Sequence, residues 1–173
     1  MCNDEPIIKS SVKEAVSDIA GAISKYAWIE ENKGYSLFVF DRGDEILRKL
    51  GSFSWTNGLS VAVPVLMSAI RLNDDAMRNQ ALCCINNIIH NSLNPSSGLP
   101  YDAYSDEGVW SVKGWWYNGM KTGGHSGYIV GQGLYYIMKA YEFVSVHCKK
   151  QYDEWLEYVK PVIEKLTHTA NGD

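Results

Sequence analysis

The chain has 173 residues, of which 46% are hydrophobic and 21% are charged, and its net charge is −4. This length and composition fit one globular domain over residues 1–173 and exclude a disordered chain. The negative charge, without a basic stripe, argues against nucleic-acid binding.

The sequence also argues against a membrane span and a secretory signal. The longest uncharged helical stretch, residues 59–70, is shorter than the ~18 residues that a span needs. The N-terminal MCNDEPIIKSSVKE has acidic residues where a signal peptide has a basic and then an apolar stretch. Cys83 and Cys84 are adjacent, and the four cysteines form neither a disulfide framework nor spaced metal-ligand pairs. We therefore expect a cytoplasmic protein without metal or cofactor, whose cysteines are small buried hydrophobes.

Apolar periodicity predicts an all-α chain of five helices and almost no strand. Three helices are amphipathic, with one apolar stripe each, and two are apolar on all sides, which indicates complete burial. The two kinds alternate, starting and ending with an amphipathic helix. Pro64 lies inside the first buried helix and predicts a kink or a later start near Val63. The predicted helices span residues 7–31, 59–72, 74–91, 126–147 and 152–167.

The connections alternate as well. Tight turns follow the two buried helices, at Asn73 and at about residues 148–151, whereas long loops, residues 32–58 and 92–125, precede them. Tight turns make neighbouring helices antiparallel, so the buried helices should run parallel, with both long loops at one rim. The prediction is an incomplete (α/α) toroid of about two inner and three outer helices. Loops longer than about 12–15 residues are usually functional.

A weak internal repeat supports this arrangement. The segments TNGLSVAVPVLMSA from Thr56 and HSGYIVGQGLYYIM from His125 share a polar pair, a glycine and an apolar helix. Gly127, Gly131 and Gly133 each weaken a helix by roughly 1 kcal/mol relative to alanine. We therefore expect these three glycines to allow close packing between the inner helices.

The two long loops are rich in aromatic rings and carboxylates. An aromatic ring stacks on the C–H face of a pyranose, while Asp, Asn and His bind its hydroxyls. Cleavage of a glycosidic bond needs two carboxyl groups, one to protonate the leaving oxygen and one to activate water or attack. The alternative is that the aromatic residues only pin the loops down. The catalytic candidates are Asp102 and Asp41, and the substrate-binding candidates are Trp55, Asn57, Tyr101, Trp110, Trp115, Trp116 and His125.

Each candidate also has a structural alternative. Asp41, in FDRGDE, fits a salt-bridged turn, and Asp102 follows a Pro-Tyr pair that fixes its backbone. His125, at the mouth of an inner helix, suits a sugar ligand or proton carrier and equally a helix cap. Asn57 and Ser126 stand where N-caps are expected.

Four segments resemble the six-hairpin glycosidase superfamily of (α/α)6 toroids, and more narrowly its uncharacterised bacterial members. They are FSWTNGLSVAVPVL, NPSSGLPYDAY, VWSVKGWWYNG and TGGHSGYIVGQGLYYIMKAYE, and the resemblance covers about residues 34–143. It implies a carbohydrate-active enzyme with its cleft at the loop rim and acidic catalytic residues, usually working with inversion. A full ring has six inner and six outer helices, and two inner helices are visible here. Any catalytic carboxylate on the missing hairpins is therefore absent.

Several functions fit these features. A glycoside hydrolase comes first, but a sugar epimerase or isomerase would use His125 as proton carrier. A polysaccharide lyase would need a basic residue such as Arg42, Lys113 or Lys121. A non-catalytic carbohydrate-binding module needs no acid pair. The neighbouring acids Asp106 and Glu107 fit a solvated turn.

The predicted helices also bear on partners. The inner helices have no charged face over residues 59–70 and 126–138 and need apolar neighbours on all sides, whereas three amphipathic stripes cover only their outer flank. We expect self-association, most simply two-fold, or contact with the remainder of a larger chain. The competing outcome is that the long loops fold back and plug the open side.

Overall fold

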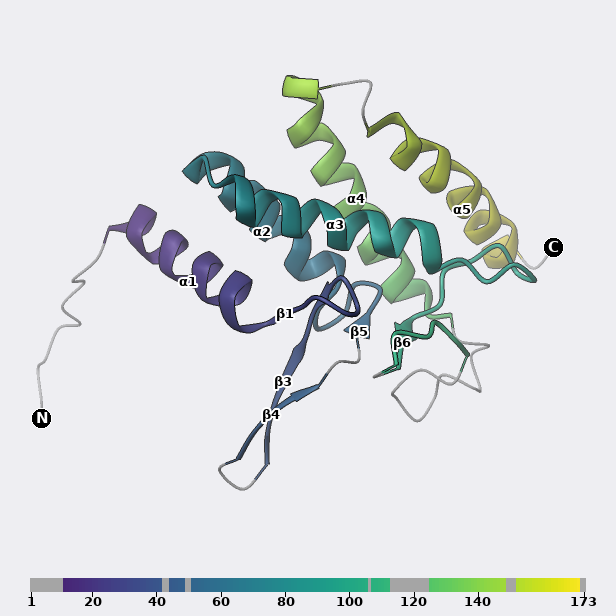
Figure 1. The fold of residues 1–173 in the computed structure, drawn as a ribbon. Helices are drawn as coiled ribbons and strands as arrows, with labels where there is room; N and C mark the ends of the chain where they lie inside the picture. The colour runs from purple at the N-terminus through teal and green to yellow at the C-terminus, as the bar shows by residue number, and fades with distance from the viewer. Residues whose placement is uncertain are drawn as a thin grey trace, which may run out of the picture.

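Five α-helices dominate the described part of the chain (Figure 1). The computed structural model describes residues 11–41, 44–48, 51–105, 107–112, 125–148 and 152–171, and it leaves out the side chains of residues 37–48, 147–148 and 169–171. The helices are α1 (Val12–Tyr26), α2 (Leu59–Leu72), α3 (Asp75–Asn91), α4 (Gly127–Cys148) and α5 (Asp153–Asn171). The prediction of a mostly helical chain is confirmed. Among the described helices, none is both long and apolar enough to span a membrane.

Helix α1 is shorter than predicted at both ends. The Ser11 hydroxyl accepts the backbone N–H of Glu14, and the Glu14 carboxylate accepts the backbone N–H of Ser11, which forms a capping box. After Tyr26 the chain leaves the helix and enters a strand. Ala20 is buried and the partly buried Ile23 packs against the core, whereas Val12 and Ile19 are 82% and 63% exposed. The helix therefore contacts the core through Ala20 and Ile23.

Helix α2 lies among the other helices, in contact with α1, α3 and α4. It starts at Leu59, so Pro64 does not delay its start, and the proline is exposed. Asn73 ends it in the left-handed conformation, with φ 57° and ψ 41°. Asp74 then caps α3 by accepting the Met77 backbone N–H at 2.9 Å. The predicted tight turn at Asn73 is confirmed.

The two long loops contain short strands that the sequence interpretation missed. Leu37–Asp41 (β3) and Asp44–Arg48 (β4) form an antiparallel hairpin. The run Leu-Phe-Val-Phe is rich in strand-forming residues, and the pairing of Asp41 with Asp44 leaves two residues between the strands, as in a tight hairpin. The remaining strands are β1 (Trp28–Ile29), β2 (Gly34–Tyr35), β5 (Gly51–Ser52) and β6 (Ala103–Tyr104).

The two long loops meet each other through β5 and β6. Gly51 lies opposite Tyr104, and Ser52 lies opposite Ala103, in an antiparallel pair. This pairing brings parts of both loops side by side, and that they form the rim of a toroid stays a prediction. Figure 1 shows α2 and α4 starting beside this pair and ending on the far side of the molecule, so the two helices run in the same general direction.

Helix α4 is not buried on all sides, contrary to the prediction. It packs mainly on α2 and α5, and its opposite face is open to solvent. Tyr128 and Tyr135 are 67% and 58% exposed on that face, where Lys139 pairs with Glu142 at 3.0 Å. The sequence interpretation took too little account of Lys139, which interrupts the apolar pattern. The buried stripe is Ile129, Val130, Leu134, Ile137, Ala140 and Val144.

Of the three glycines on α4, one serves close packing. A Cβ atom at Gly133 would overlap the ring of Phe53, which is fully buried next to β5. At Gly127 and Gly131, no described atom lies within 4 Å of such a Cβ. The expectation of close helix packing is therefore wrong for these two positions, and at Gly133 the neighbour is a loop residue rather than a helix.

The glycines of α4 give a matched pair of substitutions. Gly131→Ala should raise the free energy of unfolding by about 0.5–1 kcal/mol, because alanine has the higher helix propensity and the site is open. Gly133→Ala should lower it by about 1–3 kcal/mol, because the methyl group collides with Phe53. Urea denaturation followed by circular dichroism measures both. Equal effects of the two substitutions would contradict this account of Gly133.

Self-association stays a prediction, and the exposed face of α4 is the surface that should carry it. In a two-fold antiparallel contact, Lys139 and Glu142 of one copy face Glu142 and Lys139 of the other. Tyr135→Glu should therefore shift the chain toward the monomer by placing a charge in the contact. Multi-angle light scattering at micromolar concentration measures the mass, with Val12→Glu on the exposed face of α1 as control. A wild-type chain that is entirely monomeric would refute the expectation.

Candidate functional site

Asp102 connects both long loops to the start of α4. Its backbone carbonyl accepts the Phe53 N–H at 2.7 Å, and its carboxylate Oδ1 accepts the Ser126 N–H at 2.7 Å. The residue is 2% exposed. Its Oδ2 is buried and has no hydrogen-bond partner within the part of the chain that the structure describes. A buried polar atom of this kind is unusual and calls for a structural or chemical explanation.

Burial raises the pKa of Asp102 from 3.8 to about 6, although the Ser126 N–H and the nearby His125 act to lower it. Removal from water disfavours the charged carboxylate, and one hydrogen bond offsets only part of this effect. The positive end of the α4 dipole lies beside the same carboxylate. Asp102 is therefore a carboxyl group that keeps its proton up to pH about 6, well above the usual range of an aspartate.

His125 is fixed beside Asp102 by contacts to the loop before it. Its Nδ1–H donates to the Pro100 carbonyl at 2.8 Å, since a carbonyl can only accept. In the neutral ring, Nε2 then accepts from the Ser97 hydroxyl, at 2.9 Å. The ring stacks on Tyr101 with centroids 5.8 Å apart. The predicted cluster of Asp102, His125 and Tyr101 is thus brought together at one end of α4.

The side-chain amide of Asn57 forms hydrogen bonds within the first loop through both its oxygen and its nitrogen. Its Oδ1 accepts the Ser52 N–H at 2.6 Å and its Nδ2 donates to the Tyr35 carbonyl at 2.9 Å, while the side chain is 1% exposed. The expected N-cap role is wrong, because the cap of α2 is Gly58 with φ 65°. A side chain at Gly58 would overlap the Ser52 carbonyl oxygen. Because both polar atoms of its side chain are bonded within the protein, Asn57 holds the loop in shape.

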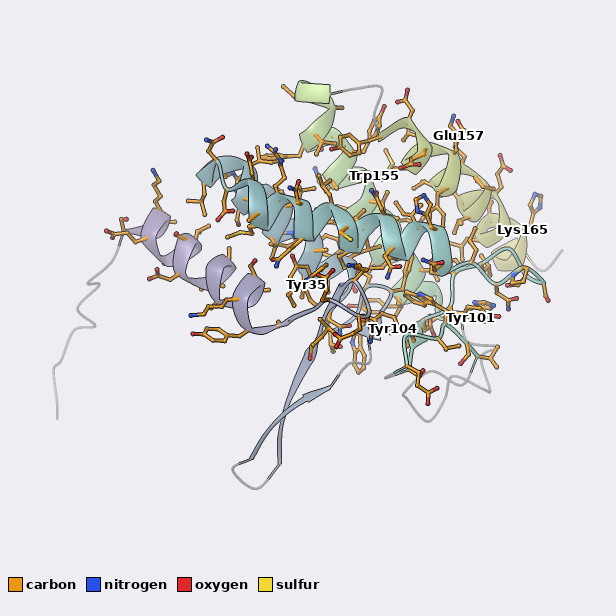
Figure 2. The ribbon with its side chains drawn as sticks, in the orientation of Figure 1. Tyr35, Tyr101, Tyr104, Trp155, Glu157 and Lys165 are labelled. Carbon is orange, nitrogen blue, oxygen red and sulfur yellow. The ribbon has the colours of Figure 1, made fainter. Side chains whose placement is uncertain are left out.

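Tyr104 packs where the two long loops meet. Its ring lies against Gly34 and Gly51, where a side chain would collide with it, and it contacts the edge of the Trp110 ring at a centroid distance of 4.9 Å. Figure 2 shows Tyr35 and Tyr104 beneath α3, where the short strands meet. Trp110 is half-buried, and Trp55 is 41% exposed with its backbone N–H bound to the Ser52 hydroxyl. The aromatic residues serve partly as core and partly as exposed surface.

Three of the candidates cannot be placed as side chains. Trp115 and Trp116 lie outside the described residues. Asp41 is the last residue of β3, and its backbone lies opposite Asp44. The β3–β4 hairpin extends away from the helices (Figure 1), and its side chains lie outside the description. The pairing of Asp41 with Asp102 as two catalytic carboxylates therefore stays a prediction.

Sequence analysis missed the residues that orient the cluster. Ser97 and the Pro100 carbonyl hold His125, and Tyr104 joins the loops. Ser97, Pro100 and Tyr104 lie in the same segment as Tyr101 and Asp102, NPSSGLPYDAY, and this proximity is the signal in the sequence. Among the described residues, no group of three or more His, Cys, Asp or Glu side chains could hold a metal ion.

Comparison of the chain with protein-family models, curated proteins and solved structures gives no match. Its function is therefore inferred from the residues of the site.

The raised pKa of Asp102 predicts a pH-dependent stability. The folded state binds a proton up to pH about 6 and the unfolded state only up to about 3.8, so this group's stabilising contribution is complete below pH 4 and is lost as the pH rises through 6. Asp102→Asn should remove this loss, which amounts to about 3 kcal/mol at most. Urea unfolding of both proteins at pH 4, 5, 6 and 7 measures the difference.

The exposed Glu157→Gln serves as control and should leave the wild-type pH profile unchanged. Parallel profiles for wild type and Asp102→Asn would show that Asp102 ionises normally in the folded protein.

Proposed function

We propose that the chain belongs to a carbohydrate-active protein of the six-hairpin glycosidase type, an incomplete (α/α) toroid in which Asp102 donates the proton to the leaving oxygen. The observation that carries the proposal is the buried, partly unsatisfied carboxyl group of Asp102 at the meeting point of two aromatic-rich loops. A general acid for glycoside cleavage needs a raised pKa, so that it is protonated at the working pH. A cytoplasmic location remains part of the proposal.

The helix arrangement supports the toroid. Helices α2 and α4 contact each other, α1 and α3 lie on α2, and α5 lies on α4. Both loops that precede α2 and α4 meet at one end, through β5 and β6. In a toroid of helical hairpins, this end is the rim where a substrate cleft forms.

The proposal needs a second carboxylate to activate water or to attack the sugar. Asp41 remains the sequence-based candidate for this role. Inverting enzymes hold their two carboxyl groups roughly 6.5–9.5 Å apart, which leaves room for a water molecule. Any second group within this distance of Asp102 Oδ2 would serve equally.

An epimerase or isomerase that uses His125 as proton carrier is supported less. Both ring nitrogens of His125 are already bound, to the Pro100 carbonyl and the Ser97 hydroxyl. Proton transfer to a sugar would require the Nε2 contact with Ser97 to break. A carbohydrate-binding role without catalysis is the second candidate function, and a polar cavity beside Trp110 favours it.

Asp102→Asn tests the hydrolase. Release of reducing sugar from a panel of oligosaccharides should fall by about 10²–10⁴-fold, the usual contribution of a general acid. Turnover of nitrophenyl glycosides should fall much less, because nitrophenolate leaves without protonation. Wild-type turnover should decline above pH about 6, as Asp102 loses its proton.

Glu157→Gln is the control for this experiment. Figure 2 shows Glu157 on α5, well away from Tyr101 and Tyr104 at the rim. This substitution should leave turnover unchanged. Equal loss on both substrate classes would mean that Asp102 positions the loops rather than donating a proton. Undiminished oligosaccharide turnover in Asp102→Asn would overturn its catalytic role.

A further inference from the structure

A polar cavity of about 420 Å³ lies between the end of α3, the β1–β2 turn and the loop after β6. Its volume is within the range of small-molecule sites. The lining residues that matter for recognition are Glu31, Asn32, Asn87, Asn91, Glu107 and Trp110, called here the Trp110 cavity.

Contacts among three separate segments form this cavity. The Asn87 amide on α3 donates to the Asn32 carbonyl in the β1–β2 turn at 2.9 Å. One helical turn later, the Asn91 amide donates to Asn87 Oδ1 at 2.8 Å. On the third side, Gly108 approaches Asn32 so closely that a Cβ would lie 3.2 Å from Asn32 Oδ1, and its φ of 76° favours glycine. The cavity is therefore built by contacts between segments far apart in the sequence.

Trp110 supplies an apolar wall to an otherwise polar cavity. The ring is held by the edge contact with Tyr104 at 4.9 Å and by the bridge between the two backbones. It remains only half-buried. A ring that is fixed on one edge and accessible on another can stack on the C–H face of a sugar without first being ordered.

The charged residues that line the cavity indicate which class of ligand it can bind. Glu31 and Glu107 contribute carboxylates, and Asn91 contributes an amide, which can bind hydroxyl groups. Among the described lining residues, Lys33 is the one with a positive charge, and its amino group pairs with Glu30. An anionic ligand would therefore meet the carboxylate of Glu107, while the described cation of the lining is already paired with Glu30. A neutral polyhydroxylated ligand suits the lining better.

We infer that the Trp110 cavity binds a neutral saccharide, separately from the catalytic step assigned to Asp102. The indole ring stacks on the sugar, while the carboxylate of Glu107 and the amide oxygen of Asn91 accept hydrogen bonds from its hydroxyls. The inference rests on the proposed carbohydrate function and adds to it a second place where the sugar chain is held. A uronic acid should bind more weakly, because its carboxylate would lie near that of Glu107.

Isothermal titration of the whole chain with neutral gluco-, xylo- and manno-oligosaccharides tests this inference. Glu107→Gln and Asn91→Leu should each weaken binding of the tightest neutral ligand by about tenfold or more, as expected when a hydrogen bond to a sugar hydroxyl is lost. Glu157→Gln, the matched exposed control, should bind as wild type does. An oligogalacturonate should bind at least tenfold more weakly than the neutral sugars.

The outcomes separate this inference from the proposed hydrolase. Binding that is unchanged in both cavity variants, with circular dichroism showing normal folding, overturns the cavity while leaving the hydrolase to be judged by Asp102→Asn. Binding that falls in the cavity variants without any turnover supports the cavity and refutes the hydrolase. No binding of any neutral sugar by the wild-type chain, or preferred binding of the galacturonate, overturns the inference.

Discussion

The contact at Asp102 ties together the parts of the chain on which the candidate site depends. Its backbone oxygen binds the first long loop at Phe53, and its side chain binds the start of α4 at Ser126. The first bond is made by the backbone and joins the two loops, whereas the second depends on the Asp102 side chain and joins the second loop to α4. The rim thus has a defined shape because one polar residue is buried where three segments meet.

This arrangement places two demands on a single carboxyl group. As a link, Asp102 needs only Oδ1, which accepts a hydrogen bond from Ser126. Oδ2 contributes no described hydrogen bond and remains buried, which is unfavourable for the ionised form. An asparagine would provide the link without a buried charge. That the chain carries an aspartate here is the physical reason for assigning it a chemical role as well as a structural one.

The helices were predictable from the sequence because each has a strong periodic signal or a local cap. Asn73 and Asp74 mark the α2–α3 turn. Helix α2 starts at Leu59, directly after Gly58, whose positive φ of 65° favours glycine. The start of α1 differs from the prediction because the Ser11–Glu14 capping box begins the helix at Val12. The open face of α4 could not be predicted from apolar content alone, because burial depends on which neighbours are present.

The candidate site was predictable only in part. The sequence places Tyr101, Asp102 and His125 in the long loop that precedes α4, and their closeness within that loop comes from the structure. It could not show that Asn57 is internal, since its partner Tyr35 lies in another strand. Nor could it reveal the Trp110 cavity, whose three segments come together only through tertiary contacts of Asn87 and Gly108. Local patterns predict elements, whereas sites depend on contacts between distant segments.

The pairing of β5 with β6 has a consequence for the order in which the protein folds. Gly51 and Ser52 acquire their strand partners only when Tyr104 and Ala103 are in place, and Phe53 packs on Gly133 and Tyr158, which come later still. Contacts of such long range form slowly, because a long loop must close first. During synthesis from the N-terminus, the α2–α3 hairpin can therefore form early, while the first rim loop stays without its partners until α4 and α5 have emerged. Refolding of this loop should be the slowest step, and its apolar residues are the segment most exposed to misassembly in the meantime.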